Sequence, residues 1–220
     1  MNACHGAVAA VLIGTASLSH AQIAVYSFTG STTAATSVAA NLTAGNFGGS
    51  NSPTVNVPSP VYSAGSGSYA ISQDTWTGSV PGTNYFTFTL TPSAGYSLSV
   101  TSVSFGSRST TTGPTAFSLR SSANSYAGSL LGGSLTNDSA WYSSGNHSVS
   151  LTFSSATTFR LYASGASSGV GTLRIDDFRI NGTLSAVPEP STYALIFGAT
   201  ALAFAIRRRG KSRKPGQRLV

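Results

Sequence analysis

Apolar residues recur at every second position through the middle of the chain, between residues 22 and 186. The clearest run has Phe86, Phe88 and Leu90 alternating with the threonines at positions 87, 89 and 91. This spacing places one face of a β-strand on a core and the other face in water. No helical periodicity interrupts residues 22–186. The pattern therefore excludes a helical fold for this region and predicts an all-β domain.

Further runs predict strands near residues 23–28, 98–105, 117–119, 149–153, 159–163 and 173–180. Two runs change parity, near Thr101–Ser102 and at Asp176–Asp177, and such a switch requires a β-bulge. Clusters of Gly, Ser, Asn and Pro separate the runs, and the longest of them, residues 45–68, is expected to be irregular. We assign residues 22–186 to an antiparallel, jelly-roll-like β-sandwich.

Charge is scarce, because only 8% of the residues are charged. The net charge of +7 arises mainly in residues 207–218, whereas residues 22–186 hold five Arg against four Asp. Binding of a nucleic-acid backbone needs a face lined with Lys and Arg. The body has no such surplus, so nucleic acid is excluded as a partner.

The first 21 residues have the pattern of a signal peptide. An apolar run from Ala7 to Leu18 precedes Ser19 and Ala21, which are small residues at the two positions that signal peptidase reads. We expect a signal helix that is cleaved after Ala21, and a buried helix is the alternative. Cys4 would leave with this segment, and the exported chain would then contain neither a disulfide nor a cysteine nucleophile.

A second apolar segment, residues 193–206, follows Pro188-Glu189-Pro190 and precedes Arg207, Arg208 and Arg209. The prolines cannot continue a helix upstream, and the arginines can act as a cytoplasmic stop-transfer signal. Residues 187–209 are therefore expected to contain a transmembrane helix, and residues 210–220 a basic cytoplasmic tail. A buried soluble helix is the alternative.

This order of Pro-Glu-Pro, apolar helix and Arg cluster resembles the PEP-CTERM sorting signal of bacterial surface proteins, also known as the ice-binding protein C-terminal domain. The resemblance implies an exosortase as a partner, a precursor anchored in the inner membrane, and removal of the tail at the cell surface or outside the cell. Such proteins often occur in strains that make exopolysaccharide. Residues 115–122 and 159–178 are similar to ectodomains that carry this tail, and this implies a fold without an activity.

Few residues could carry catalysis. Hydrolysis of sugars by two carboxyl groups requires a matched pair, and Asp176 and Asp177 are neighbours that would point to opposite faces of a regular strand. His147 is expected in an exposed turn, and as one histidine it cannot nucleate a zinc site. We therefore predict no enzymatic activity and no cofactor, with one alternative: Asp176 and Asp177 at their bulge could hold a structural calcium ion.

Three aromatic residues lie beside polar loop residues: Trp76, Trp141 and Tyr142. Such rings can stack on the apolar faces of sugars, although each could instead cover the edge of the core. The sequence favours a non-enzymatic exported protein of the cell surface or extracellular matrix, with signal peptidase, exosortase and the membrane as partners. The alternative is a carbohydrate-binding module that contacts exopolysaccharide through these rings, and a secreted hydrolase is the third reading.

Overall fold

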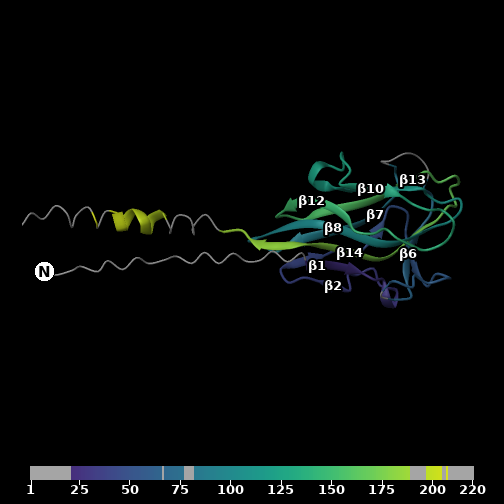
Figure 1. Ribbon diagram of the computed structural model, residues 1–220, viewed down its shortest axis with the longest axis horizontal. Coiled ribbons are helices and arrows are strands. Elements are labelled where there is room, and N and C mark those ends of the chain that lie inside the picture. The colour runs from purple at the N-terminus through teal and green to yellow at the C-terminus, as the bar shows by residue number, and fades with distance from the viewer. Residues whose placement is uncertain (1–20, 66, 77–81, 189–196, 205–206, 208–220) are drawn as a thin grey trace, which may run out of the picture.

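The computed structural model describes residues 21–65, 67–76, 82–188, 197–204 and 207. Two antiparallel sheets pack face to face, with β7, β10 and β13 in one layer and β1, β8 and β14 in the other (Figure 1). The all-β sandwich predicted from the period-two pattern is therefore confirmed. The jelly-roll subclass stays a prediction.

Sheet A contains eight strands in the described residues, and β8 and β14 form its centre. Its strands are β1 (Ala21–Tyr26), β2 (Ser37–Val38), β5 (Thr54–Asn56), β6 (Ala70–Gln73), β8 (Tyr96–Ser109), β11 (Tyr142–Ser143), β12 (His147–Phe153) and β14 (Leu173–Ala186). β8 pairs with β14 along nearly its whole length, from Ser109 opposite Leu173 to Tyr96 opposite Ala186. This long pairing provides a continuous platform on which the loops of the outer face lie.

Sheet B contains six strands in the order β10, β9, β13, β7 and β3, with β4 also paired to β7. Its strands are β3 (Leu42–Ala44), β4 (Gly48–Gly49), β7 (Tyr85–Pro92), β9 (Ala116–Ser121), β10 (Leu131–Ser134) and β13 (Thr157–Ser164). The sandwich also contains two short 3₁₀ turns, η1 (Thr29–Ser31) and η2 (Ser122–Asn124).

The core between the sheets is rich in aromatic rings. Phe88 of β7 stacks on Phe159 of β13 with ring centroids 5.0 Å apart, and it also meets Phe178 of β14 across the sandwich at 5.2 Å. Phe178 in turn stacks on Phe105 of β8 at 5.5 Å. Aromatic pairs at these separations stabilise a core beyond the burial of their area. One apolar core therefore joins the two sheets.

Both predicted bulges are present. The register of β8 against β14 shifts between Asn181 and Gly182, at the level of Thr101, and again between Asp176 and Arg179. Asp177 has φ 50°, in the left-handed region. The parity switches in the sequence thus mark the positions where one extra residue enters the ladder.

Residues 45–68 were expected to be irregular, and this expectation is partly wrong. The segment contains the short strands β4 and β5, which pair with β7 and β6. Strands of only two or three residues are too short to show a period-two pattern in the sequence. Beyond β5, residues 57–65 form a crossing loop on the outer face of sheet A, where the carbonyl oxygen of Ser59 accepts a hydrogen bond from Arg108 of β8 and the ring of Tyr62 lies against Gly106.

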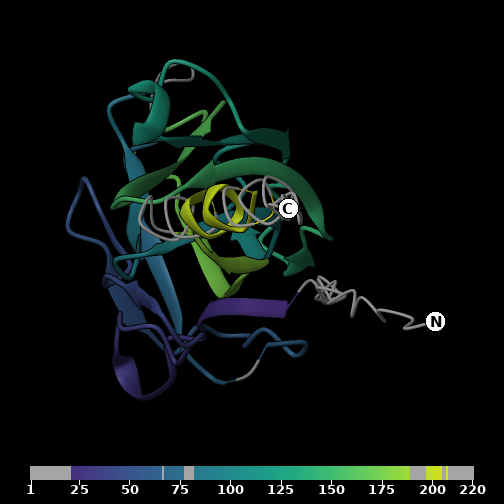
Figure 2. The same cartoon turned by 90° about the vertical axis from the view of Figure 1, so that its left-hand side faces the viewer.

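The two ends of the sandwich domain lie close together. Ala21, the first residue of β1, pairs with Gly182 of β14, four residues before that strand ends at Ala186. Figure 2 views the molecule from this end. Residues 1–20, which include Ser19 of the predicted cleavage site, lie outside the described residues, and so do Glu189 and Pro190.

The predicted transmembrane segment is only partly described, as helical residues 197–204 and Arg207. Within the described residues, no helix reaches the length and apolar character that a membrane crossing requires. Arg208, Arg209 and residues 210–220 lie outside the described part of the chain.

Candidate functional site on the outer face of sheet A

Trp76 lies in the core. Its side chain is 0% exposed, its ring centroid is 5.2 Å from that of Phe86, and its indole N–H donates to the carbonyl oxygen of Gln73 at 2.7 Å. A ring that is closed off from solvent cannot stack on a glycan. The predicted glycan-stacking role of Trp76 is therefore wrong, and the alternative reading, a core residue, is correct.

Trp141 and Tyr142 do not form one platform. Trp141 is half-buried against Tyr62, with ring centroids 5.2 Å apart, and its indole N–H donates to the carbonyl oxygen of Pro60 at 2.8 Å. Tyr142 is 41% exposed, and its hydroxyl donates to Oδ2 of Asp138 at 2.5 Å. The aromatic partner of Trp141 is thus Tyr62, which the sequence analysis missed because it lies in the stretch expected to be irregular.

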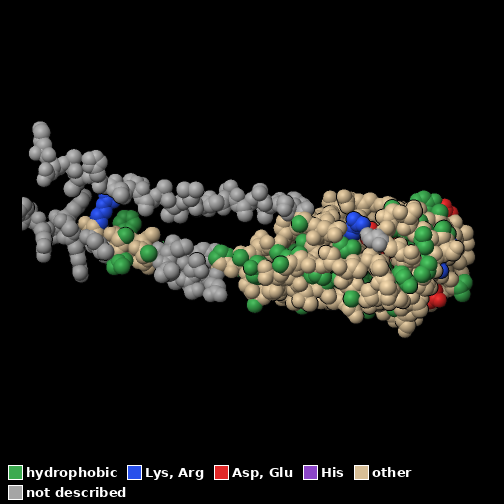
Figure 3. Space-filling view, turned by 90° about the horizontal axis from the view of Figure 1, so that it is seen from below, with side chains coloured by type: hydrophobic (Ala, Val, Ile, Leu, Met, Phe, Trp, Pro, Cys, Tyr) green, Lys and Arg blue, Asp and Glu red, His purple; other side chains and the backbone are tan. Residues whose placement is uncertain are grey.

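A cavity of about 260 Å³ opens beside Tyr62 on the outer face of sheet A. Its lining residues come from the crossing loop, from β8, from β11 and from the bulge of β14: Tyr62, Ala64, Ser104, Phe105, Gly106, Ser143, Asp177 and Arg179. The face seen in Figure 3 carries few charged side chains. The cavity thus brings an aromatic ring, two serine hydroxyls and one charged pair together.

The charged pair consists of Arg179 and Asp177. Nε and Nη2 of Arg179 lie 2.7 Å and 2.5 Å from Oδ2 of Asp177. The Asp177 side chain is 6% exposed and that of Arg179 is 40% exposed. Hydrogen bonds between charged groups are shorter and stronger than neutral ones. The bulge therefore holds a fixed donor and acceptor set at the edge of the cavity.

Asp176 is buried beneath the crossing loop, at 1% exposure. Its Oδ1 accepts a hydrogen bond from the backbone N–H of Asp177 at 2.6 Å, and burial raises the pKa of its carboxyl group to about 7. A Cβ at Gly65 would lie 2.8 Å from Oδ2 of Asp176 and 2.9 Å from Cδ1 of Tyr62. Glycine at position 65 lets the loop close over the carboxyl group.

The alternative of a structural calcium ion at Asp176 and Asp177 is not favoured by the contacts of these two side chains. The carboxylate of Asp177 is already neutralised by Arg179, and Oδ1 of Asp176 already accepts the hydrogen bond from the backbone. The part of the chain that the structure describes brings no three His, Cys, Asp or Glu side chains together as a metal cluster. A calcium site usually needs six or more oxygen ligands.

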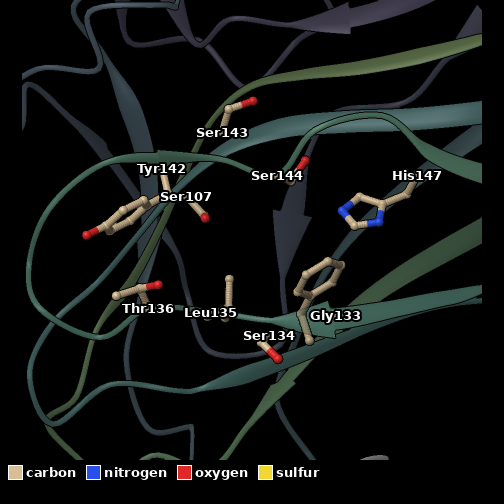
Figure 4. Close-up of a pocket in the computed structure, with 10 residues that line it drawn as sticks. Ser107, Gly133, Ser134, Leu135, Thr136, Tyr142, Ser143, Ser144 and His147 are labelled. Carbon is tan, nitrogen blue, oxygen red and sulfur yellow. The ribbon is translucent and has the colours of Figure 1, made fainter.

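A second cavity, of about 200 Å³, lies between β10 and β11 and contains His147 (Figure 4). His147 is the first residue of β12 and is half-buried, so the prediction of an exposed turn residue is wrong. Its ring meets that of Phe117 at 5.3 Å, and its Nε2 has no hydrogen-bond partner. The described lining residues include serines but no carboxylate that could orient the imidazole as a catalytic triad requires.

Solved structures with a partial likeness to the chain include TmCBM61 in complex with β-1,4-galactotriose. It has 15% identity and a TM-score of 0.36, over 67% of this chain and 89% of that chain. The K3 adhesin domain of Lys-gingipain from Porphyromonas gingivalis has 13% identity and a TM-score of 0.38, over 74% and 99%. The CBM22 tandem domain of Xyn10C from Paenibacillus barcinonensis has 13% identity and a TM-score of 0.36, over 80% and 49%.

The curated proteins contain no match to the chain. A protein family does match, directly after the sandwich: residues 186–209 fit the family described as the PEP-CTERM protein-sorting motif. The chain thus carries a PEP-CTERM sorting motif at residues 186–209, and the resemblance drawn from Pro188, Glu189 and Pro190 is confirmed.

Proposed function

We propose that this chain is a non-enzymatic protein of the cell surface or extracellular matrix, exported under an N-terminal signal and sorted through its C-terminal motif. The observation that carries the proposal is the position of the sorting motif. It begins at residue 186, where the last strand, β14, ends. An exosortase can therefore remove the sorting segment without cutting a strand of the sandwich, which is released or attached as a complete domain.

The test follows the full chain in a bacterium that has an exosortase. Mass spectrometry of the surface and extracellular fractions should find a product that begins at Gln22 and lacks Arg207. Replacing Glu189 by Ala should shift the protein to the membrane fraction as a longer, unprocessed form, whereas the matched Asp74→Asn change in the sandwich should leave processing intact. Intact chain dissolved in the cytosol would overturn the proposal.

A second candidate function is carbohydrate binding, and the cavity beside Tyr62 favours it. Sugar rings present an apolar face that stacks on aromatic side chains, and hydroxyl groups that need a few fixed polar partners. Tyr62 is 9% exposed, lines the cavity with its ring and is supported by Trp141, whereas Asp177 and Arg179 supply an acceptor and a donor. Tyr142, which lines the other cavity, has no part in this site.

Affinity electrophoresis of the full chain in gels that contain neutral polysaccharides tests this second function. Trp141→Ala should abolish retardation, because Tyr62 loses its supporting ring. Trp141→Phe keeps an aromatic ring and should retain most of the binding. Equal retardation of the wild-type chain and Trp141→Ala would exclude this cavity as the site.

A further inference from the structure

Two arginines lie opposite each other on the outer face of sheet B. Arg120 of β9 and Arg160 of β13 are register partners, and both alternate with core residues of their strands. Like charges directly opposite each other on neighbouring strands destabilise a sheet. The described part of the chain places no carboxylate in an ion pair with either of them, unlike Arg179 on sheet A. An anion brought by a ligand would relieve this repulsion.

Tyrosine rings hold Arg160 in place. Its guanidinium carbon lies 4.2 Å from the ring centroid of Tyr85 and 4.0 Å from that of Tyr126, and Nη1 lies 3.4 Å from the hydroxyl of Tyr162. Stacking on a ring uses the faces of a guanidinium group and leaves its N–H edges able to donate. Arg160 is therefore preorganised for a planar acceptor such as a carboxylate.

Arg120 fixes the segment that carries Tyr126. Its Nη1 donates to the carbonyl oxygens of Tyr126 at 2.9 Å and of Ala127 at 3.1 Å. The Nε atoms of Arg120 and Arg160 are buried, as is that of Arg174 on sheet A, so a ligand cannot meet them. An anion at this surface would meet the Nη atoms of Arg160, whose guanidinium faces lie on the rings of Tyr85 and Tyr126.

We propose that Arg160, stacked on Tyr85 and Tyr126 and backed by Arg120, binds the carboxylate groups of an acidic, uronate-bearing polysaccharide. A guanidinium group meets a carboxylate with two parallel hydrogen bonds, and the tyrosine rings beside it can stack on the sugar that carries the carboxylate. The inference rests on the proposed surface or matrix role, and it names the class of polymer. It places this contact on sheet B, away from the cavity beside Tyr62.

The probe is polygalacturonate, with its methyl-esterified form as the neutral counterpart. Isothermal titration of the full chain in mild detergent should detect binding to polygalacturonate. Binding to the methyl ester should be at least about tenfold weaker, and binding to polygalacturonate should weaken as the salt concentration rises. Arg160→Gln should weaken binding to polygalacturonate by about tenfold or more. Arg174→Gln removes one positive charge from sheet A and should change binding by less than about twofold.

Arg160→Lys provides a second variant if the glutamine change affects folding. It keeps the charge but not the planar fork, and it should still weaken binding several-fold. Failure of the wild-type chain to bind polygalacturonate, or equal losses in Arg160→Gln and Arg174→Gln, would overturn the inference. Binding to neutral glycans that is lost in Trp141→Ala and unchanged in Arg160→Gln would overturn it too, while leaving the carbohydrate function of sheet A in place.

Discussion

Each sheet places two arginines opposite each other on its outer face, Arg108 with Arg174 on sheet A and Arg120 with Arg160 on sheet B, but the sheets differ in what holds these side chains. On sheet A, Arg179 is paired with Asp177, and Arg108 donates to the carbonyl oxygens of Ser139 and Ser59, which anchors the crossing loop. On sheet B, Arg160 rests on tyrosine rings beside Arg120. The body has nearly balanced charge, so placement decides which guanidinium group serves the fold and which can serve a ligand.

The largest effect should come from the core that both faces share. Trp76→Ala removes a fully buried ring and should lower the free energy of unfolding by about 3–5 kcal/mol. Trp141→Ala removes a half-buried ring from one face and should cost about 1 kcal/mol. Urea unfolding of the two variants measures this difference. Similar costs for both would mean that the face of sheet A is as integral to the fold as the core.

The second effect compares a glycine on sheet A that Tyr62 covers with a glycine on sheet B that no ring covers. A Cβ at Gly106 of β8 would lie within 2.6 Å of Cδ1 of Tyr62, whereas a Cβ at Gly48 on sheet B would meet Thr87 Cγ2 at 3.9 Å, an ordinary contact. Gly106→Ala should therefore cost about 2 kcal/mol through displacement of Tyr62. Gly48→Ala is the matched control and should change the free energy of unfolding by less than about 0.5 kcal/mol, as measured by thermal unfolding.

The third effect is a pH dependence that belongs to sheet A. Because burial raises the pKa of Asp176 from 3.8 to about 7, the folded chain keeps this proton at pH values where the unfolded chain releases it. The free energy of unfolding should therefore fall as the pH rises toward 7. This loss accumulates between about pH 4 and about pH 7, at up to about 1.4 kcal/mol per pH unit.

Asp176→Asn should remove that pH dependence and should make the protein more stable than the wild type near pH 8, because an amide needs no proton to remain neutral. Asp138→Asn is the control. The hydrogen bond from Tyr142 lowers the pKa of Asp138, so its titration lies below this window. Urea unfolding across the range gives the slopes, and an unchanged slope in Asp176→Asn would contradict the assignment.

The smallest effect compares the two arginines directly. Arg179→Gln leaves the buried carboxylate of Asp177 without this guanidinium and should cost about 1 kcal/mol, an amount limited by the exposure of Arg179. Arg160→Gln loses contact with two rings but also removes the repulsion from Arg120, so it should change the free energy of unfolding by less than about 0.5 kcal/mol. Equal losses in low salt would show that both arginines are structural.

Much of the fold could be predicted from the sequence. The period-two runs located β7, β12 and β13, and the parity switches located both bulges, because alternation is a local property of a strand. Seven strands of two to four residues were not predicted, because they are too short to show a period: β2, β3, β4, β5, β6, β10 and β11. The sorting motif was also readable, since its three parts are contiguous in the chain.

The candidate sites were harder to predict from the sequence than the fold. Trp76 and Trp141 both stand beside polar residues in the sequence, yet one lies in the core and the other on the surface. Tyr62 had no signal that could mark it as the partner of Trp141, which lies 79 positions later. Burial depends on what the rest of the chain places over a residue, and this is why no local pattern separated the two tryptophans.

The amino-acid sequence by itself determined the longer strands, the bulges and the sorting motif, because each of these depends on residues that are neighbours along the chain. Only the tertiary structure decided that Tyr62 meets Trp141, and that Arg160 rests on Tyr85 and Tyr126. The physical reason is that antiparallel pairing and loop crossing bring together residues that lie far apart in the chain, and register and burial then set their charge and exposure.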